Sequence, residues 1–196
     1  MVITHTLLMN YLNCWEMIRE MYIEWEINKE ELKSYSLEEF NEDGDIWGFM
    51  ILDLGDYQLG CLSDIFDVDE ESNIDKELLE GDDLIAYNID NLIKCGISLL
   101  KNKSFKFHLL DYNKVEFHVV WDEDVKIEMI DYFTKELFYF YSISFDDLVA
   151  EIKTDYTKYI NDIKEINEVI LQSKMLKNTS RLYDEFLNLL EQKASD

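Results

Sequence analysis

The chain has 196 residues, 47% of them hydrophobic and 14% aromatic, which is enough apolar surface for one folded domain with a sizeable core. Its 43 acidic residues against 18 lysines and arginines give a formal net charge of −25 at pH 7, which argues against direct binding to nucleic acid or to an anionic membrane. No apolar stretch reaches the roughly 18 residues of a membrane span. No lysine or arginine precedes Arg19, so the N-terminal residues lack the basic start of a secretory signal. The cysteines Cys14, Cys61 and Cys95 lack metal or redox spacing, so we expect a cytoplasmic protein in which they are packing residues.

Residues 1–33 are predicted to form an N-terminal helix. Apolar residues recur there at alternating spacings of three and four, with glutamates on the other side, which is the period of an amphipathic helix. We interpret this apolar stripe as part of the core. Its members are Leu8, Tyr11, Trp15, Ile18, Tyr22 and Trp25.

Residues 34–83 are predicted to contain a short helix, a β-hairpin and an acidic loop. Ser36 and Glu39 have the spacing of a capping box, so a helix is expected to start there. The run from Ile46 to Leu54 and the run from Tyr57 to Leu62 flank Gly55-Asp56, and this pattern predicts a hairpin.

The same segment carries 17 acidic residues against one base, Lys76. Self-repulsion on this scale opposes compaction, so we interpret the charge as a docking surface for a basic partner. A calcium loop fits less well, because an EF-hand alignment from Asp67 places Ser72 at the required glycine and Leu78 at the closing glutamate. The predicted partner-binding residues are Glu38, Glu39, Glu42, Asp43, Asp45, Asp67, Asp69, Glu70, Glu71, Asp75, Glu77, Glu80, Asp82 and Asp83.

Residues 84–144 are predicted to form a helix followed by a four-stranded antiparallel meander. Asp82 or Asp83 is expected to cap the helix, which ends near Lys101-Asn102. From Ser104 onwards the apolar period changes from 3.6 to 2, which indicates strands.

The register of the meander follows from its apolar faces. A three-residue loop that contains Asn113 brings Phe107 near Phe117 or Val119, whereas a two-residue turn places the apolar sets on opposite sides. The last strand, Leu137 to Ile143, is apolar on both sides, so we expect it to be central or covered on its second face by a helix.

One face of the meander gathers polar residues whose chemistry suits zinc or iron. Such residues also decorate any half-exposed sheet, so we predict no metal site. Phosphate-binding glycine loops and serine or cysteine nucleophile motifs are absent from the sequence, so we predict no cofactor, no catalytic residue and no enzymatic activity. The polar residues of this face are His108, Glu116, His118 and Glu128.

Residues 145–196 are predicted to form C-terminal helices. Ser144 is a candidate N-cap for a long helix whose apolar stripe continues to Ile170, and a final helix is expected after the break at Asn178-Thr179-Ser180. The predicted fold class is α+β: a single domain, 1–196, with an antiparallel meander and an additional N-terminal hairpin packed against long N- and C-terminal helices.

Three stretches together resemble uncharacterised bacterial proteins associated with toxin-immunity loci. They are Trp47-Gly48-Phe49-Met50-Ile51-Leu52-Asp53-Leu54-Gly55, the hairpin from Phe107 to Trp121-Asp122 with its turn at Asp111-Tyr112-Asn113, and Phe145-Asp146-Asp147-Leu148-Val149-Ala150-Glu151. The resemblance implies an immunity role and transfers no functional residue.

Three functions remain open from the sequence. The first is a cytoplasmic immunity protein that blocks a basic, nuclease-like toxin by electrostatically steered binding. The second is a phage-type anti-restriction or anti-defence protein that mimics DNA in a DNA-binding groove. The third is a metal-dependent enzyme that uses the histidines of the meander. The oligomeric state is also left open.

Overall fold

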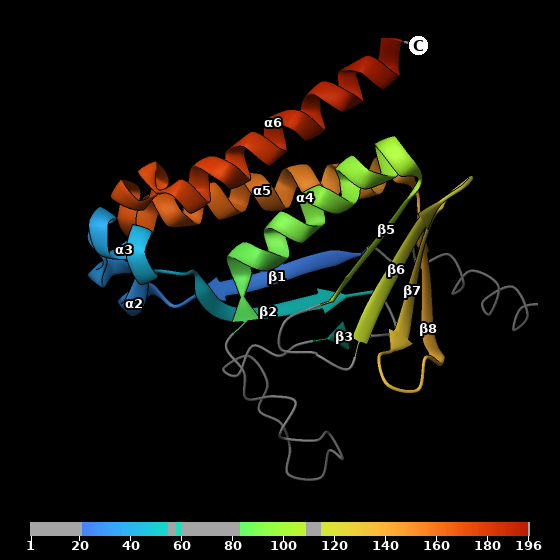
Figure 1. The fold of residues 1–196 in the computed structure, drawn as a ribbon, viewed down its shortest axis with the longest axis horizontal. Helices are drawn as coiled ribbons and strands as arrows, with labels where there is room; N and C mark the ends of the chain where they lie inside the picture. Colours follow the sequence, from blue (N-terminus) through green and yellow to red (C-terminus); the bar gives the residue numbers. More distant parts are fainter. Residues whose placement is uncertain (1–20, 55–57, 60–82, 109–114, 196) are drawn as a thin grey trace, which may run out of the picture.

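The computed structural model describes residues 21–54, 58–59, 83–108 and 115–195, and it confirms the predicted α+β class (Figure 1). The described elements are β1 (Tyr22–Ile27), α2 (Lys29–Ser34), α3 (Leu37–Asp43), β2 (Trp47–Asp53), β3 (Gln58–Leu59), β4 (Asp83–Leu84), α4 (Ile85–Asn102), β5 (Ser104–His108), β6 (Val115–Trp121), β7 (Val125–Asp131), β8 (Leu137–Ile143), α5 (Phe145–Asn167), the 3-10 helix η2 (Glu168–Gln172) and α6 (Lys174–Ser195). Helix α4 packs against both antiparallel sheets and against the long helices α5 and α6, and α5 contacts β1.

The first sheet has the order β1-β2-β3, with β4 also paired to β2. The pairing of Leu52 with Leu59 confirms the predicted hairpin. The predicted N-terminal helix is wrong over residues 22–27, which form the strand β1, and its earlier part lies outside the described residues. Trp25 fits a helical stripe, but Trp25 and Ile27 are buried while Glu24 and Glu26 are exposed, which is a period of two. Pairing with β2 therefore decided the conformation. Trp25 is a core residue as predicted, whereas Tyr22 of the same predicted stripe is 43% exposed.

The second sheet is the predicted meander, in the order β5-β6-β7-β8. Phe107 lies opposite Phe117, with ring centroids 4.7 Å apart, so the predicted register is confirmed. The prediction for β8 is wrong, because this strand lies at the end of the sheet order and Phe138 and Phe140 remain 43% and 49% exposed. Aromatic residues on both sides of a strand indicate β propensity, and they do not require burial of both faces.

The two predicted caps of the long helices have different outcomes. Ser144 caps α5 as predicted, because its hydroxyl accepts a hydrogen bond from the Asp147 N–H at 3.0 Å. The predicted aspartate cap of α4 is wrong. Leu84 is the N-cap without a side-chain hydrogen bond, and Asp83 pairs with Gly48 in β4 instead, while Asp82 lies outside the described residues.

The final helix, α6, is continuous through residues 178–180, so the predicted break there is wrong. The Thr179 hydroxyl donates to the Asp90 carboxylate at 2.7 Å, so this polar side chain is satisfied without interrupting the helix. The chain turns earlier, at η2 and Ser173, where the Ser173 hydroxyl accepts a hydrogen bond from the Leu176 N–H at 3.2 Å. Tertiary contact with α4 therefore outweighs the turn propensity of this run.

The buried apolar residues of both sheets and of α4, α5 and α6 form one contiguous cluster. Helix α4 contributes Ile89 and Ile93 to it, and the inner face of the meander contributes Phe117 and Met129. Cys95 is buried in this cluster, as expected for a packing residue, and burial raises the pKa of its thiol to about 12. The other two cysteines lie outside the described residues.

Candidate functional site

The predicted docking surface is described only at helix α3. Glu38, Glu39, Glu42 and Asp43 lie on this helix and are exposed, whereas Asp45 follows it and is half-buried. The structure therefore places four of the predicted carboxylates together on one short element. For Asp83 the backbone alone is described, and the remaining predicted residues lie outside the described part of the chain: Asp67, Asp69, Glu70, Glu71, Asp75, Glu77, Glu80 and Asp82.

Helix α3 is fixed at both ends. The capping box is confirmed, because the Glu39 N–H donates to the Ser36 hydroxyl at 3.3 Å and the Ser36 N–H donates to the Glu39 carboxylate at 2.9 Å. Phe40 is buried beneath the helix, and the Asn41 side chain accepts a hydrogen bond from the Lys174 N–H of α6 at 2.8 Å. The exposed carboxylates of α3 therefore project from a helix whose position is fixed by these contacts.

Two of the charges on α3 oppose the dipole of the helix. Glu42 and Asp43 lie in the last turn, which contains no base, and the helix dipole disfavours carboxylates at that end. Within the described part of the chain, Glu38, Glu42 and Asp43 form no ion pair. Their charge is thus uncompensated by described neighbours and open to solvent.

Two of the predicted residues have local structural tasks. The Glu39 carboxylate accepts the Ser36 backbone hydrogen bond of the capping box, and the hydrogen bonds from Ser36 lower the pKa of Glu39. The Asp45 carboxylate accepts a hydrogen bond from the Ile46 N–H at 2.8 Å, while burial raises its pKa. We therefore restrict the described docking residues to Glu38, Glu42 and Asp43.

Sequence reasoning missed a group of acids next to this helix. The strand β1 exposes Glu24 and Glu26, and α2 carries Glu30 and Glu31 in its first turn. Figure 1 shows α2 and α3 beside each other at the end of β1. The predicted helix already had Glu24 on its polar side, and the period of two in residues 22–27 is the signal that also places Glu26 on the surface.

The polar face of the meander forms as predicted. His108 lies opposite Glu116, and His118 lies opposite Glu128. The Glu116 carboxylate contacts His118 Nε2 and accepts a hydrogen bond from Lys135 at 3.0 Å, and these partners lower its pKa to about 2. In the described ranges no three histidine, cysteine or acidic residues are grouped so that they could hold a metal ion. The arrangement is an ion-pair network around one carboxylate.

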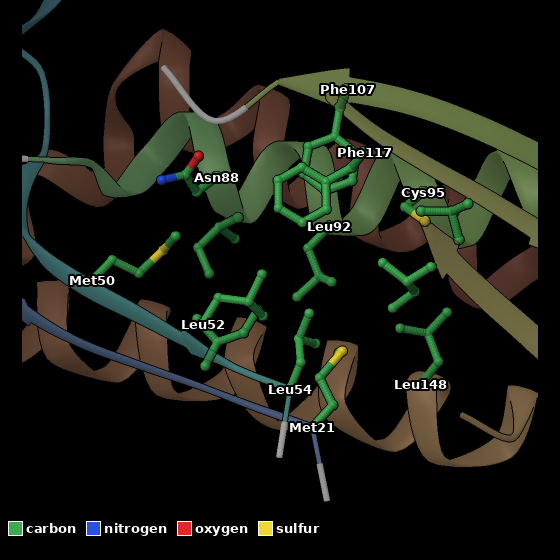
Figure 2. A pocket seen from close by; sticks show the side chains of 14 residues that line it. Met21, Met50, Leu52, Leu54, Asn88, Leu92, Cys95, Phe107, Phe117 and Leu148 are labelled. Atoms are coloured by element: carbon green, nitrogen blue, oxygen red, sulfur yellow. The ribbon is translucent and has the colours of Figure 1, made fainter. Parts of the chain in front are cut away.

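The core contains a cavity of about 50 Å³ between α4 and the two sheets (Figure 2). It is lined by apolar residues of every layer, including Met50, Leu92 and Phe117, and by one polar residue, Asn88. The Asn88 amide is buried and has no hydrogen-bond partner among the described residues. The residues that line the cavity include no charged side chain, so the cavity has no group that could orient a charged ligand.

Comparisons with known proteins found no relative of this chain. No family model, no curated protein and no solved structure matches it. In the described ranges, no helix is long and apolar enough to cross a membrane.

Proposed function

We propose that this protein is a cytoplasmic immunity protein that neutralises a basic toxin by direct binding, and that α3 is the described part of its docking surface. The supporting observation is the set of exposed carboxylates of Glu38, Glu42 and Asp43, held on a capped helix without a described cation partner. Two of them occupy the end of the helix where the dipole disfavours negative charge. Such charge costs stability in the free protein, and a basic partner would recover that cost.

The mechanism follows from electrostatics. Residues 21–54 contain ten acids and two lysines, so the surface that includes α2 and α3 attracts a cationic protein before contact. Steering of this kind raises association rates to about 10⁸ M⁻¹s⁻¹ at low salt, against about 10⁵ to 10⁶ M⁻¹s⁻¹ for neutral pairs. The bound protein then blocks the toxin sterically, which requires no catalytic residue.

Charge reversal tests the proposal. The probe is a basic toxin encoded beside this gene, and its affinity is measured by calorimetry at two salt concentrations. We expect the triple variant Glu38→Lys, Glu42→Lys, Asp43→Lys to lose more than tenfold in affinity, and we expect wild-type binding to weaken as salt rises. Glu39 is left unchanged because it closes the capping box.

A matched control carries the same change in net charge elsewhere. Glu123→Lys, Asp184→Lys and Glu191→Lys replace exposed acids that form no ion pair with another described residue. This control should bind within about twofold of wild type. Equal affinities for the α3 variant and the control would contradict the assignment of α3, and wild-type binding that is insensitive to salt would contradict the proposed mechanism.

A further inference from the structure

A group of exposed apolar side chains gathers at the hairpin between β7 and β8. Leu137, Phe138 and Phe140 are 43% to 55% exposed, and Phe133 in the connecting turn is 71% exposed. Tyr132 lies beside Phe133, with their ring centroids 5.5 Å apart in an edge-to-face arrangement. We call these five residues the hairpin patch.

The hairpin patch belongs to the outer face of the meander. Phe140 pairs with Glu128 of the polar face, and a register shift between Met129 and Ile130 pairs Leu137 with Ile130 on the same side. Tyr139 and Tyr141 point to the core side. Figure 1 places the β7–β8 hairpin at the opposite end of the molecule from α2 and α3. The patch is therefore separate from the proposed docking surface.

The area of the hairpin patch is large for a surface that stays in water. With about 200 Å² for each large side chain, the exposed fractions amount to about 500 Å². Apolar patches of this size lie at the upper end of what monomers expose, and they mark interaction sites. When two copies bury the patch against each other, the total reaches about 1,000 Å², which is the lower bound for a specific interface.

The local charge around the hairpin patch favours a second copy of this chain as the partner that covers it. Residues 125–143 contain two lysines, Lys126 and Lys135, against three acids, so this region is nearly neutral in a chain of net charge −25. A basic partner gains little from a neutral surface, whereas two copies of an acidic protein repel each other least where the local charge is balanced. An apolar patch in a nearly neutral region can face the same patch on a second copy, because a two-fold interface places identical surfaces opposite each other.

We propose that the hairpin patch is a homodimer interface in which a second copy of this chain packs its own Phe133 and Phe140 against it. The two-fold arrangement leaves α3 of each copy at the far end. The dimer then presents two docking surfaces, each with its own partner.

The test is sedimentation velocity of the full chain across a concentration series. We expect the wild type to dimerise, and we expect Phe133→Lys and Phe140→Lys each to raise the dimer dissociation constant at least tenfold. The matched control is Val120→Lys, since Val120 is 41% exposed on β6 outside the patch, and this variant should dimerise as wild type does. Thermal unfolding of each variant checks that the fold is retained.

The outcomes separate this inference from the proposed function. A wild type that stays monomeric at every concentration overturns the interface, as does a dimer that persists in both patch variants. Dimerisation should strengthen as salt screens the repulsion between two copies of charge −25, whereas binding of a basic toxin should weaken. Loss of toxin binding in the α3 variant with an intact dimer therefore bears on α3 alone.

Discussion

The Ile23 backbone N–H donates a hydrogen bond to the Glu151 carboxylate at 3.1 Å, and this contact joins β1 to α5 across 128 positions of sequence. Two further contacts follow the same line. Lys158 donates to the Trp25 carbonyl at 3.4 Å, and the Trp25 indole N–H donates to Asp162 at 3.2 Å. Side chains of α5 therefore satisfy polar groups of β1 on the side away from β2.

Asp155 lies on α5 between Glu151 and Lys158, and it is 2% exposed. Burial raises its pKa to about 8, the Glu151 carboxylate adds to the rise, and Lys158 opposes it. One of its carboxyl oxygens has no hydrogen-bond partner among the described residues. Burial therefore favours the protonated form of this side chain.

The Asp155→Asn variant should be more stable than wild type at pH 7, by roughly 2 to 4 kcal/mol. The folded-state pKa lies above the unfolded value near 4, so the folded protein binds the proton more tightly. Wild-type stability from this group is complete below about pH 4 and declines as the pH rises towards 8. The amide does not titrate, so the difference between the proteins should grow across that range in urea unfolding.

A control on the same helix is Glu165→Gln, which changes an exposed carboxylate. Its free energy of unfolding should follow the wild-type pH dependence. A difference between Asp155→Asn and wild type that is independent of pH would contradict the raised pKa.

Glu116→Gln should destabilise the protein at pH 7 by about 1 kcal/mol, because the Lys135 ammonium loses its carboxylate acceptor and the contact with His118 is weakened. The pKa of Glu116 is lowered to about 2 by His118 and Lys135, so its contribution is present above its ordinary pKa and is lost as the pH falls towards 2. The difference from wild type should therefore shrink below about pH 4.5 in urea unfolding. Glu128 lies on the same face and forms no described ion pair. The Glu128→Gln variant should therefore change the free energy of unfolding less, and with less dependence on pH.

Gly96→Ala should destabilise the protein although alanine favours helix by about 1 kcal/mol. A Cβ atom at this position of α4 would lie 2.6 Å from Phe186 and 2.8 Å from Ile152, and both of those side chains are fully buried. Overpacking of a core costs about 1 to 3 kcal/mol, so we expect a net loss of roughly 1 to 2 kcal/mol by chemical denaturation. Lys94→Ala on the same helix should change stability by less than about 0.5 kcal/mol.

The double variant Glu42→Lys, Asp43→Lys should be more stable than wild type in the absence of a partner, by about 0.5 to 1 kcal/mol. It replaces acids by cations in the last turn of α3, where the dipole favours positive charge. Glu38→Lys provides the opposite control, because Glu38 lies in the first turn and its reversal should destabilise the protein. If thermal unfolding showed that the two variants change the melting temperature in the same direction, this account would be contradicted.

The melting temperature of the wild type should rise from low to moderate concentrations of sodium chloride. Residues 34–83 carry 17 acids against one lysine, and screening over a Debye length of about 10 Å at 0.1 M relieves the repulsion between like charges. Calorimetric scans at constant pH measure the effect. A flat or falling melting temperature would mean that these carboxylates are already paired within the fold.

Local chemistry in the sequence determined several features of this fold. Ser36 with Glu39, and Ser144 ahead of α5, satisfy backbone N–H groups within three residues, so their spacing alone predicts both helix starts. The register of Phe107 with Phe117 also follows from the sequence, because a shift by one residue would turn an apolar face to water. The excess of acid that motivates the docking surface is likewise a property of composition.

Tertiary structure decided the features whose stabilisation comes from distant residues. Tyr22 to Ile27 fits both a helical and a strand period, and pairing with β2 selects the strand. Thr179 carries turn propensity, and its hydrogen bond to Asp90 of α4 lets α6 continue. The outer face of β8 is exposed at Phe138 and Phe140, and the apolar pattern within Leu137–Ile143 does not indicate whether another element covers that face. Each of these outcomes depends on contacts between segments far apart in the chain, whose free energies exceed the local propensities that a sequence pattern reports.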